Sequence, residues 1–381
     1  MKSNKLFFVV FLLFFNFSVL SAFEWGGLAD DNTKYTVADS PSFSQSNGIY
    51  LWLKTPLNKD GSFSVSAEGL YKYKLNLTGL NKTPKSEFIN ILDIDLLKLH
   101  GSWDAFNGEM NLNAGRYFYS DNSGAVFSQV SDGLDFSYAN NFLGFSVYGG
   151  YTGLLNSLNV SMTEKNPDAK NKQIYNLCAA YVPVAVKFSL LDLGGFSASL
   201  EGDYFISLNK NIKNRAYASL NVGGPISTIG IVNFNFAAGT YEFKELMLFS
   251  NIDVNFFVGK LFLVGAGGEY GSGANAEKKL AAFSSVTSRS IYSGLRPVKN
   301  DYIAPHLSGT FVMNKFYAKL TEKTVIVPED ETKLFGLDSV LDLKYNIFSD
   351  LQVGANGTLY FDFGDKKYNN ISFSINAALE F

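Results

Sequence analysis

The sequence predicts an all-β fold, a single transmembrane antiparallel β-barrel of about 18 strands, with 16 strands as the alternative. Three observations lead to this prediction: an N-terminal segment of the export type, an aromatic-rich composition without helical periodicity, and strand-like alternation along the chain. The alternation is clearest over 371–381, where apolar and polar residues alternate and the chain stops on Phe381. A period of two places one set of side chains on each face of a strand.

Residues 1–22 have the composition of a cleaved secretory signal peptide. Lys2 and Lys5 precede a short apolar run, and small residues follow up to Ala22. The apolar run is too short to cross a bilayer as a helix. We therefore expect cleavage after Ala22.

The composition after this segment is typical of an all-β envelope protein. The chain contains 35 Phe, 21 Tyr and 34 Gly, and no later stretch approaches the ~20 apolar residues of a transmembrane helix. Without Lys2 and Lys5, 30 basic residues face 35 acidic ones, and this balance gives no reason to expect nucleic acid as a partner. The single Cys178 cannot form an internal disulfide.

Strand-like alternation recurs over 63–77, 196–208, 232–238 and 351–363. One face of nearly every such segment carries charged or amide side chains, which a water-filled lumen accommodates. Acids outnumber bases on these faces, so we expect a mild preference for cations. The residues predicted to line the pore are Glu68, Lys72, Lys74, Glu201, Asp203, Asp253, Glu269, Asp342, Lys344 and Asp362.

The connections between these segments alternate in length, as they do in transmembrane barrels with short periplasmic turns and longer outer loops. Seventeen strands can be counted from residue 47, so 47–381 is predicted to be the barrel and 23–46 a first strand or a small periplasmic plug. The longest connections lie near 120–131, 155–172 and 272–300. The short turns are predicted near 60–61, 107–108, 140–141, 194–195, 227, 259–260, 314 and 349–350.

The last strand carries a resemblance to a known class. Its apolar face is formed by Phe373, Ile375, Leu379 and Phe381. This arrangement resembles the C-terminal assembly signal of bacterial outer-membrane β-barrel proteins of the porin-like kind. The resemblance implies an outer-membrane location in a Gram-negative-type envelope and contact with outer-membrane lipid. It further implies recognition of this strand by the barrel-assembly machinery and passage of small solutes. Many porins are trimers, so the resemblance also allows a homotrimer.

Two histidines limit the enzymatic chemistry that the sequence allows. His100 and His306 each precede a serine by two positions, and His100 with Ser102 resembles the His-x-Ser arrangement of the outer-membrane phospholipase, where an Asn orients the histidine. Asn111 or Asn113 could supply that Asn. The spacing and the surrounding sequence differ from that family, so we expect both histidines to be girdle or lumen residues. The sequence predicts no enzyme activity, cofactor or metal.

A short segment around Arg116 resembles a pattern of porin-like barrels, in which an arginine-bearing strand precedes a loop that returns through Asp132-Gly133. Arg116 belongs either to the pore wall or to the membrane interface, where its guanidinium would extend towards head groups. Its shared parity with Leu112 and Ala114 favours the interface.

Three functions are compatible with such a barrel. A passive channel for small hydrophilic solutes is favoured, because 16 to 18 strands enclose an aqueous path unless something fills it. The first alternative is a plugged transporter of hydrophobic compounds, similar to the long-chain fatty-acid transporters, with 23–46 as its plug. The second is a surface interaction protein that uses the loops at 155–172 and 272–300.

Overall fold

The computed structural model describes residues 23–156, 158–164, 180–274, 280–287, 301–328 and 332–381. These ranges contain 18 strands and a short 3-10 helix, η1 (Lys366–Tyr368). The strands are β1 (Glu24–Val37), β2 (Ser42–Pro56), β3 (Phe63–Thr78), β4 (Lys85–Ala105), β5 (Gly108–Ser120), β6 (Ser128–Ala139), β7 (Leu143–Tyr151), β8 (Tyr181–Leu193), β9 (Phe196–Ser207), β10 (Arg215–Ser227), β11 (Gly230–Tyr241), β12 (Glu245–Val258), β13 (Phe262–Gly271), β14 (Tyr302–Met313), β15 (Phe316–Pro328), β16 (Thr332–Asn346), β17 (Leu351–Asp362) and β18 (Asn370–Glu380).

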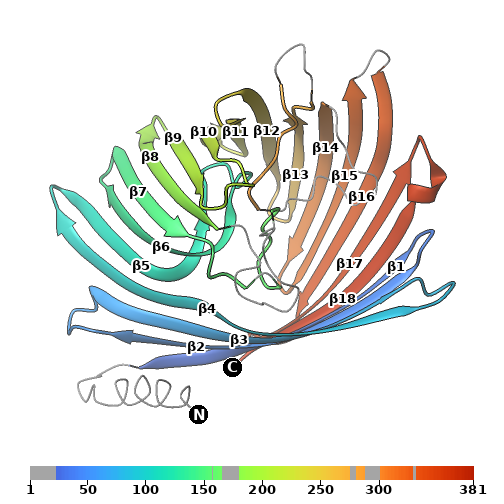
Figure 1. Ribbon diagram of the computed structural model, residues 1–381, viewed down its shortest axis with the longest axis horizontal. Coiled ribbons are helices and arrows are strands. Elements are labelled where there is room, and N and C mark those ends of the chain that lie inside the picture. The colour runs from blue at the N-terminus through green and yellow to red at the C-terminus, as the bar shows by residue number, and fades with distance from the viewer. Residues whose placement is uncertain (1–22, 157, 165–179, 275–279, 288–300, 329–331) are drawn as a thin grey trace.

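The strands form one closed antiparallel barrel (Figure 1). Each strand pairs with its neighbours in sequence, and β18 pairs with β1 from Leu28↔Glu380 to Val37↔Ile371, which closes the sheet. The prediction of 18 strands is therefore confirmed, and the alternative of 16 is wrong. Of the segment 23–46, residues 24–37 form β1 and residues 42–46 begin β2. In the described residues no helix has the length and apolar character needed to cross a membrane.

The two ends of the barrel differ in the length of their connections. At one end, called the turn end, each predicted short turn lies in or beside a connection of two to six residues. The predicted Asn107-Gly108 turn is centred one residue earlier, on Phe106 and Asn107, which have φ values of 51° and 60°. Two successive positive φ values are those of a type I′ hairpin turn. The opposite end, called the loop end, carries 152–180 and 272–301.

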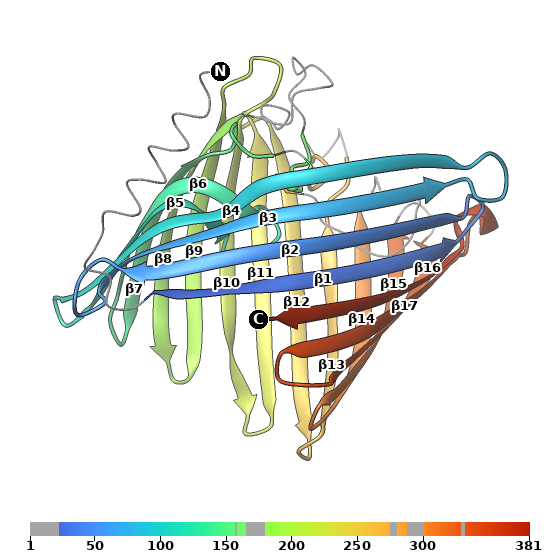
Figure 2. The same ribbon diagram turned by 90° about the horizontal axis from the view of Figure 1, so that it is seen from below.

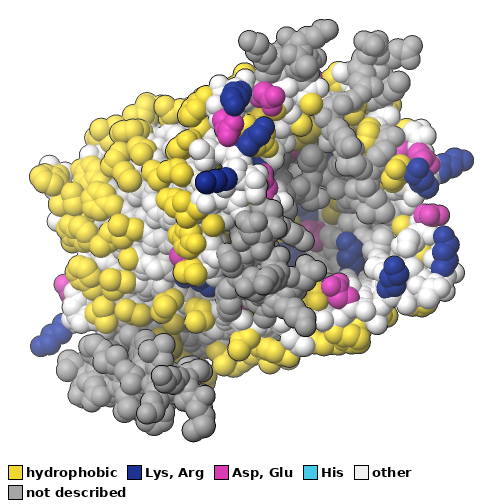
Figure 3. Space-filling view, viewed as in Figure 1, with side chains coloured by type: hydrophobic (Ala, Val, Ile, Leu, Met, Phe, Trp, Pro, Cys, Tyr) yellow, Lys and Arg dark blue, Asp and Glu magenta, His cyan; other side chains and the backbone are white. Residues whose placement is uncertain are grey.

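The outer face of the barrel is apolar. Phe373, Ile375 and Leu379 of β18 and the following Phe381 are 40–58% exposed, whereas the alternate residues Ser372 and Ser374 are buried. Figure 3 shows hydrophobic side chains covering the outer wall on the left of the view, where few charged side chains are seen; most of those in view gather toward the top and the right. The alternation in the sequence thus corresponds to an apolar outer surface and a polar inner one.

The wall changes its course between β4 and β5. β4 contains a bulge at Asp95, because Glu68 pairs with Leu96 while Gly69 pairs with Ile94. Only residues 97–105 of β4 pair with β5; the described part of the chain provides no ladder partner on that side for residues 85–96. We call this place the β4–β5 seam. Figures 1 and 2 show β5 and β6 curving away from the long β4.

Candidate functional site

Several connections of the loop end fold into the barrel and partly fill its interior (Figure 1). Val126 O accepts hydrogen bonds from Val286 N at 2.8 Å and Thr287 N at 3.2 Å, and Thr163 N donates to Val286 O at 2.9 Å. These bonds join three segments, 121–127, 158–164 and 280–287, which we call the inner loop cluster (residue 157 and residues 275–279 and 288–300 lie outside the described residues). The cluster narrows the space inside the barrel.

The Asp121 carboxylate determines the shape of the first segment. Its Oδ1 accepts hydrogen bonds from Val126 N at 3.0 Å and Phe127 N at 2.7 Å, and its Oδ2 accepts one from Ser123 N at 2.8 Å. Val126 and Phe127 are completely buried, so these N–H groups have no access to bulk water. A carboxylate that accepts several buried backbone donors satisfies groups that would otherwise be costly to bury.

Two polar residues of β9 attach this segment to the barrel wall. Glu201 accepts hydrogen bonds from Asn122 N and from the Tyr119 hydroxyl, both at 2.7 Å. The Ser199 hydroxyl donates to Asn122 Oδ1 at 2.6 Å, and Asn122 Nδ2 donates to Ser199 O at 3.0 Å. Tyr119 belongs to β5, so this contact also ties the inward-curving β5 to β9 across the interior.

An apolar cluster lies beneath the inner loop cluster. It is formed by inward-facing residues of β8 to β12 and by buried residues of the loops. The buried members are Ala125, Val126, Phe127, Tyr181, Phe205, Ile212, Tyr217, Ala237, Met247, Phe249, Ala281 and Val286. Burial of this apolar surface holds the loops against one side of the wall.

Arg215, at the loop end of β10, provides a charged attachment point. Its side chain is only 2% exposed, and its guanidinium donates to Ser285 O at 2.9 Å and forms an ion pair with Glu164. Both partners belong to the inner loop cluster. A guanidinium presents several donors in a fixed plane, which suits it to bind two loops at once.

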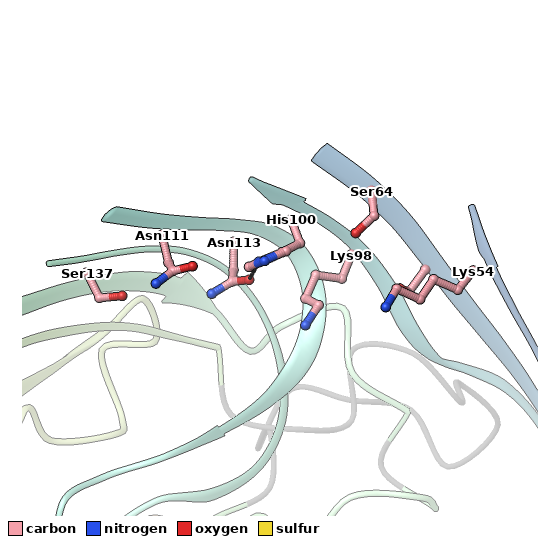
Figure 4. A pocket seen from close by; sticks show the side chains of 8 residues that line it. Lys54, Ser64, Lys98, His100, Asn111, Asn113 and Ser137 are labelled. Carbon is pink, nitrogen blue, oxygen red and sulfur yellow. Dashed lines mark hydrogen bonds between the residues drawn. The ribbon is translucent and has the colours of Figure 1, made fainter. Parts of the chain in front are cut away.

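The opposite part of the inner wall is polar and holds a cavity of about 540 Å³. Figure 4 shows its side chains projecting from one side of β2 to β6. We call it the basic pocket, because two lysines and a histidine line it together with small polar residues. The lining residues are Lys54, Ser64, Ser66, Lys98, His100, Asn111, Asn113 and Ser137.

A chain of hydrogen bonds runs along the wall of this pocket. His100 Nδ1 lies 2.9 Å from Asn113 Oδ1, and Asn113 Nδ2 donates to Asp135 Oδ1 at 3.1 Å. Asn113 therefore contacts the histidine, as the phospholipase resemblance would require. Ser102, however, donates to Glu109 at 2.7 Å, and His100 lines a cavity inside the barrel. This arrangement is that of a lumen wall.

Three of the ten residues predicted to line the pore are buried, and the loops cover two of these three. Glu201 and Asp203 are 2% and 5% exposed and lie beneath the inner loop cluster. Asp362 is also buried, and at the loop end it accepts bonds from Gly364 N and Asp365 N at 2.8 Å. Glu201 and Asp362 accept hydrogen bonds from backbone N–H groups, and none of the three acids presents an open carboxylate to the lumen.

The other seven have parity opposite to that of exposed apolar neighbours, and five of them contact other side chains of the inner wall. Asp253 lies 2.9 Å from His306, Glu269 accepts the Tyr302 hydroxyl at 2.7 Å, and Asp342 accepts Asn356 Nδ2 at 3.0 Å. The lysine ammonium groups of Lys72 and Lys344 lie over the rings of Tyr50 and Tyr317. The remaining two, Glu68 and Lys74, are half-buried on β3.

The expectation that Arg116 extends towards head groups is wrong. Its guanidinium is bound by Asp132 at 2.8 Å and by Asp93 at 3.4 Å, and it also donates to the Ile94 carbonyl at 3.2 Å. Only 14% of the side chain is exposed. The physical reason is the β4–β5 seam: β5 leaves β4 here, and the arginine binds the edge of β4 where the backbone ladder ends.

The sequence reasoning missed Asp121, Lys54 and Lys98. Asp121 is recognisable only once its loop is known to fold inward. The face of Lys98 could not be assigned, because the adjacent Leu96 and Leu97 both read as outward-facing and a regular strand allows only one of them to be so. The bulge at Asp95 explains this pattern. An available signal was the run of inward-parity aromatic residues on β9 to β12, which marks the wall that the loops cover.

The geometry of the barrel can be compared with that of known proteins. No protein-family model matches the chain, and no curated protein matches its sequence. Solved structures do match. OccK7 (OpdD) of Pseudomonas aeruginosa is 12% identical with a TM-score of 0.63, over 95% of this chain and 99% of that one. OccAB4 of Acinetobacter baumannii is 11% identical with a TM-score of 0.62, over 96% and 100%.

The outer membrane protein OprD of Pseudomonas aeruginosa is 10% identical with a TM-score of 0.57, over 94% of this chain and 93% of that one. The chain has a porin-like outer-membrane β-barrel fold. The agreement covers nearly the whole length of both chains, so it concerns the closed barrel and not a local motif. At these identities the similarity concerns the fold alone.

Proposed function

We propose that this barrel is an outer-membrane channel through which small hydrophilic solutes diffuse passively. The observation that supports this most directly is the basic pocket, a cavity of about 540 Å³ on the inner wall that is lined entirely by polar and charged side chains. Such a surface favours water and polar solutes over apolar ones. The formation of β1 by residues 24–37 also favours a channel, because a plug at 23–46 was the basis for the hydrophobic transporter.

The orientation and assembly follow from the same proposal. The turn end would face the periplasm and the loop end the exterior, as in barrels with short periplasmic turns. Export would depend on cleavage of residues 1–22, and the barrel-assembly machinery would recognise the apolar face of β18 together with Phe381, which directly follows it. Outer-membrane lipid would then contact the apolar outer face.

A mild preference for cations is the finer part of the proposal. Inward-facing acids such as Asp253, Glu269 and Asp342 support it, whereas Lys54 and Lys98 in the basic pocket act in the opposite direction. The two effects oppose each other, so the net selectivity is expected to be small.

Conductance measurements on refolded residues 23–381 in a planar bilayer test this function. Discrete current steps that scale with salt concentration are expected, and a reversal potential in a salt gradient gives the ion preference. Heat-modifiable migration on a gel shows separately that the barrel has folded. A folded barrel that conducts no current would contradict the channel, and a clear anion preference would contradict only the finer part.

A further inference from the structure

The β4–β5 seam is a place where the backbone ladder of the wall is interrupted. In the described part of the chain, residues 85–96 of β4 pair only with β3, and residues 117–120 of β5 pair only with β6. Elsewhere in an antiparallel sheet, backbone hydrogen bonds join neighbouring strands along their length. Beyond the last pair, Leu97↔Arg116, the side chain of Arg116 bridges the two strands instead.

The contacts of Arg116 on the two sides of the seam are unequal. On the side of β5 and β6, its Nε and Nη2 donate to the two carboxylate oxygens of Asp132, both at 2.8 Å. On the side of β4, its Nη1 donates to Asp93 at 3.4 Å and to Ile94 O at 3.2 Å. Short bidentate bonds to a carboxylate are strong, and the longer contacts are weaker. If β4 and β5 separate here, the guanidinium keeps Asp132 as its partner, so no uncompensated positive charge remains.

The carboxylates of β4 also have a second partner. Asn159 Nδ2 donates to Asp93 Oδ2 at 3.0 Å and to Asp95 Oδ1 at 2.6 Å. Separation of β4 from Arg116 therefore leaves Asp93 hydrogen-bonded to Asn159. Each side of the seam keeps polar partners of its own, so the seam costs less to open than a place where a backbone ladder must be broken.

Apolar side chains line both faces of the wall at the seam. On the outer face, Leu92 of β4 and Phe118 of β5 are 74% and 62% exposed. On the inner face, Leu96 packs against the buried cluster that contains Tyr117. An opened seam would therefore offer apolar surface from the lumen to the outer face, and such a surface favours a hydrocarbon chain.

The basic pocket begins where the ladder between β4 and β5 begins. Lys98 lines this pocket and directly follows Leu97, whose pair with Arg116 is the last one before the seam. Figure 4 shows the side chains of Lys54 and Lys98 extending from the wall into the interior. Two ammonium groups attract an anionic group, and the seam beside them favours a hydrocarbon chain. A ligand that fits both places has an anionic head and a single apolar chain.

We propose that the β4–β5 seam is a side passage of the barrel for anionic amphiphiles with a single hydrocarbon chain. The head group binds Lys54 and Lys98 in the basic pocket, and the chain lies in the seam and reaches the apolar outer face. Hydrophilic solutes have no chain to place there and stay in the lumen. This activity is additional to diffusion through the lumen, and its test requires no ion current.

Fluorescence of Trp52 tests where the head group binds. Trp52 shares its face of β2 with Lys54, and it is the only tryptophan in a Trp25→Phe, Trp103→Phe barrel. The probes are α-bromoalkanoates, from bromobutanoate to bromododecanoate, which carry the quenching bromine beside the carboxylate. Quenching should saturate, and Lys54→Gln with Lys98→Gln should weaken every probe by about tenfold or more. Quenching that does not saturate, or that is unchanged in the lysine variant, would overturn the proposal.

The dependence on chain length tests the seam. Referred to the free aqueous probe, the dissociation constant should fall about fourfold for each added methylene. Leu92→Ser with Phe118→Ser should remove most of this gain and leave bromobutanoate unaffected. Leu200→Ser with Phe188→Ser is the matched control, because these paired residues of β8 and β9 are 56% and 57% exposed on the outer face. Equal gains per methylene in the two folded, heat-modifiable variants would place the chain elsewhere and overturn the passage.

Chemical blocking of the seam provides a second test that leaves the barrel intact during folding. In a Cys178→Ser background, Phe118→Cys is refolded and then labelled with a bulky maleimide, which fills the outer side of the seam. The label should abolish the gain per methylene, whereas the same label on Phe188→Cys should not. An unchanged gain after complete labelling of Phe118→Cys would contradict the side passage, whether or not the barrel conducts ions.

Discussion

The carboxylate of Asp121 should hold the inner loop cluster in place, and the variant Asp121→Ala tests this. The substitution leaves Val126 N–H and Phe127 N–H buried without their acceptor. An unsatisfied buried donor costs about 1–3 kcal/mol, so the packed loop should lose roughly 2–6 kcal/mol. Since about 1.4 kcal/mol corresponds to a factor of ten, the displaced loop should gain roughly 30-fold or more relative to the packed one.

Single-channel recording measures this change directly. The wild type is expected to give steady current steps, whereas Asp121→Ala should fluctuate between levels as the 121–127 segment moves in the lumen. Asp39→Ala is the matched control, because it removes an exposed acid from another connection of the loop end. Identical noise and conductance in Asp121→Ala and the wild type would refute the reasoning, provided that both barrels remain heat-modifiable.

Three further changes have defined outcomes. Replacement of Lys54 and Lys98 by Gln should shift the reversal potential towards cations, because it removes positive charge from the basic pocket; an unchanged potential would exclude this pocket from the ion path. Arg116→Gln should lower the free energy of unfolding by about 2–4 kcal/mol, because it removes the cation that binds Asp132 and the buried Asp93. This loss is measured as a lower temperature of heat modification, which Lys244→Gln, in an exposed pair, should change little. Deletion of Phe381 should reduce the yield of folded barrel in the outer membrane, and an unchanged yield would show that the terminal aromatic residue is dispensable.

The strand count and the turns could be predicted because they depend on local rules. Alternation with a period of two fixes which residues share a face, and a closed barrel requires each strand to pair with the next. The eight short turns follow from the same pattern, since two adjacent apolar runs must reverse between them. Tertiary contacts were not needed for any of these steps.

The course of the wall between β4 and β5 could not be predicted. A bulge shifts the parity of every following residue, and the sequence around Leu96 and Leu97 gave both phases equal support. Gly115 has a φ of 115°, and a Cβ there would lie 2.1 Å from Leu97 O, so the backbone geometry at the seam requires glycine. Such requirements become visible only when the neighbouring strand is in place. The error about Arg116 has this origin.

The division of the lumen into a covered and an open side has a physical cause that the alternation alone does not contain. Inward parity predicts water contact for every polar residue of a wide barrel, and Glu201 was assigned to the pore on that basis. Aromatic residues such as Phe205, Tyr217 and Phe249 share the inward parity, and a water-filled lumen would leave them exposed. Their burial therefore requires something to cover them, and the long connections of the loop end are the parts of the chain that reach them. Inward-facing aromatic residues on consecutive strands are thus a signal, readable in the sequence, for the side of a barrel on which its loops pack.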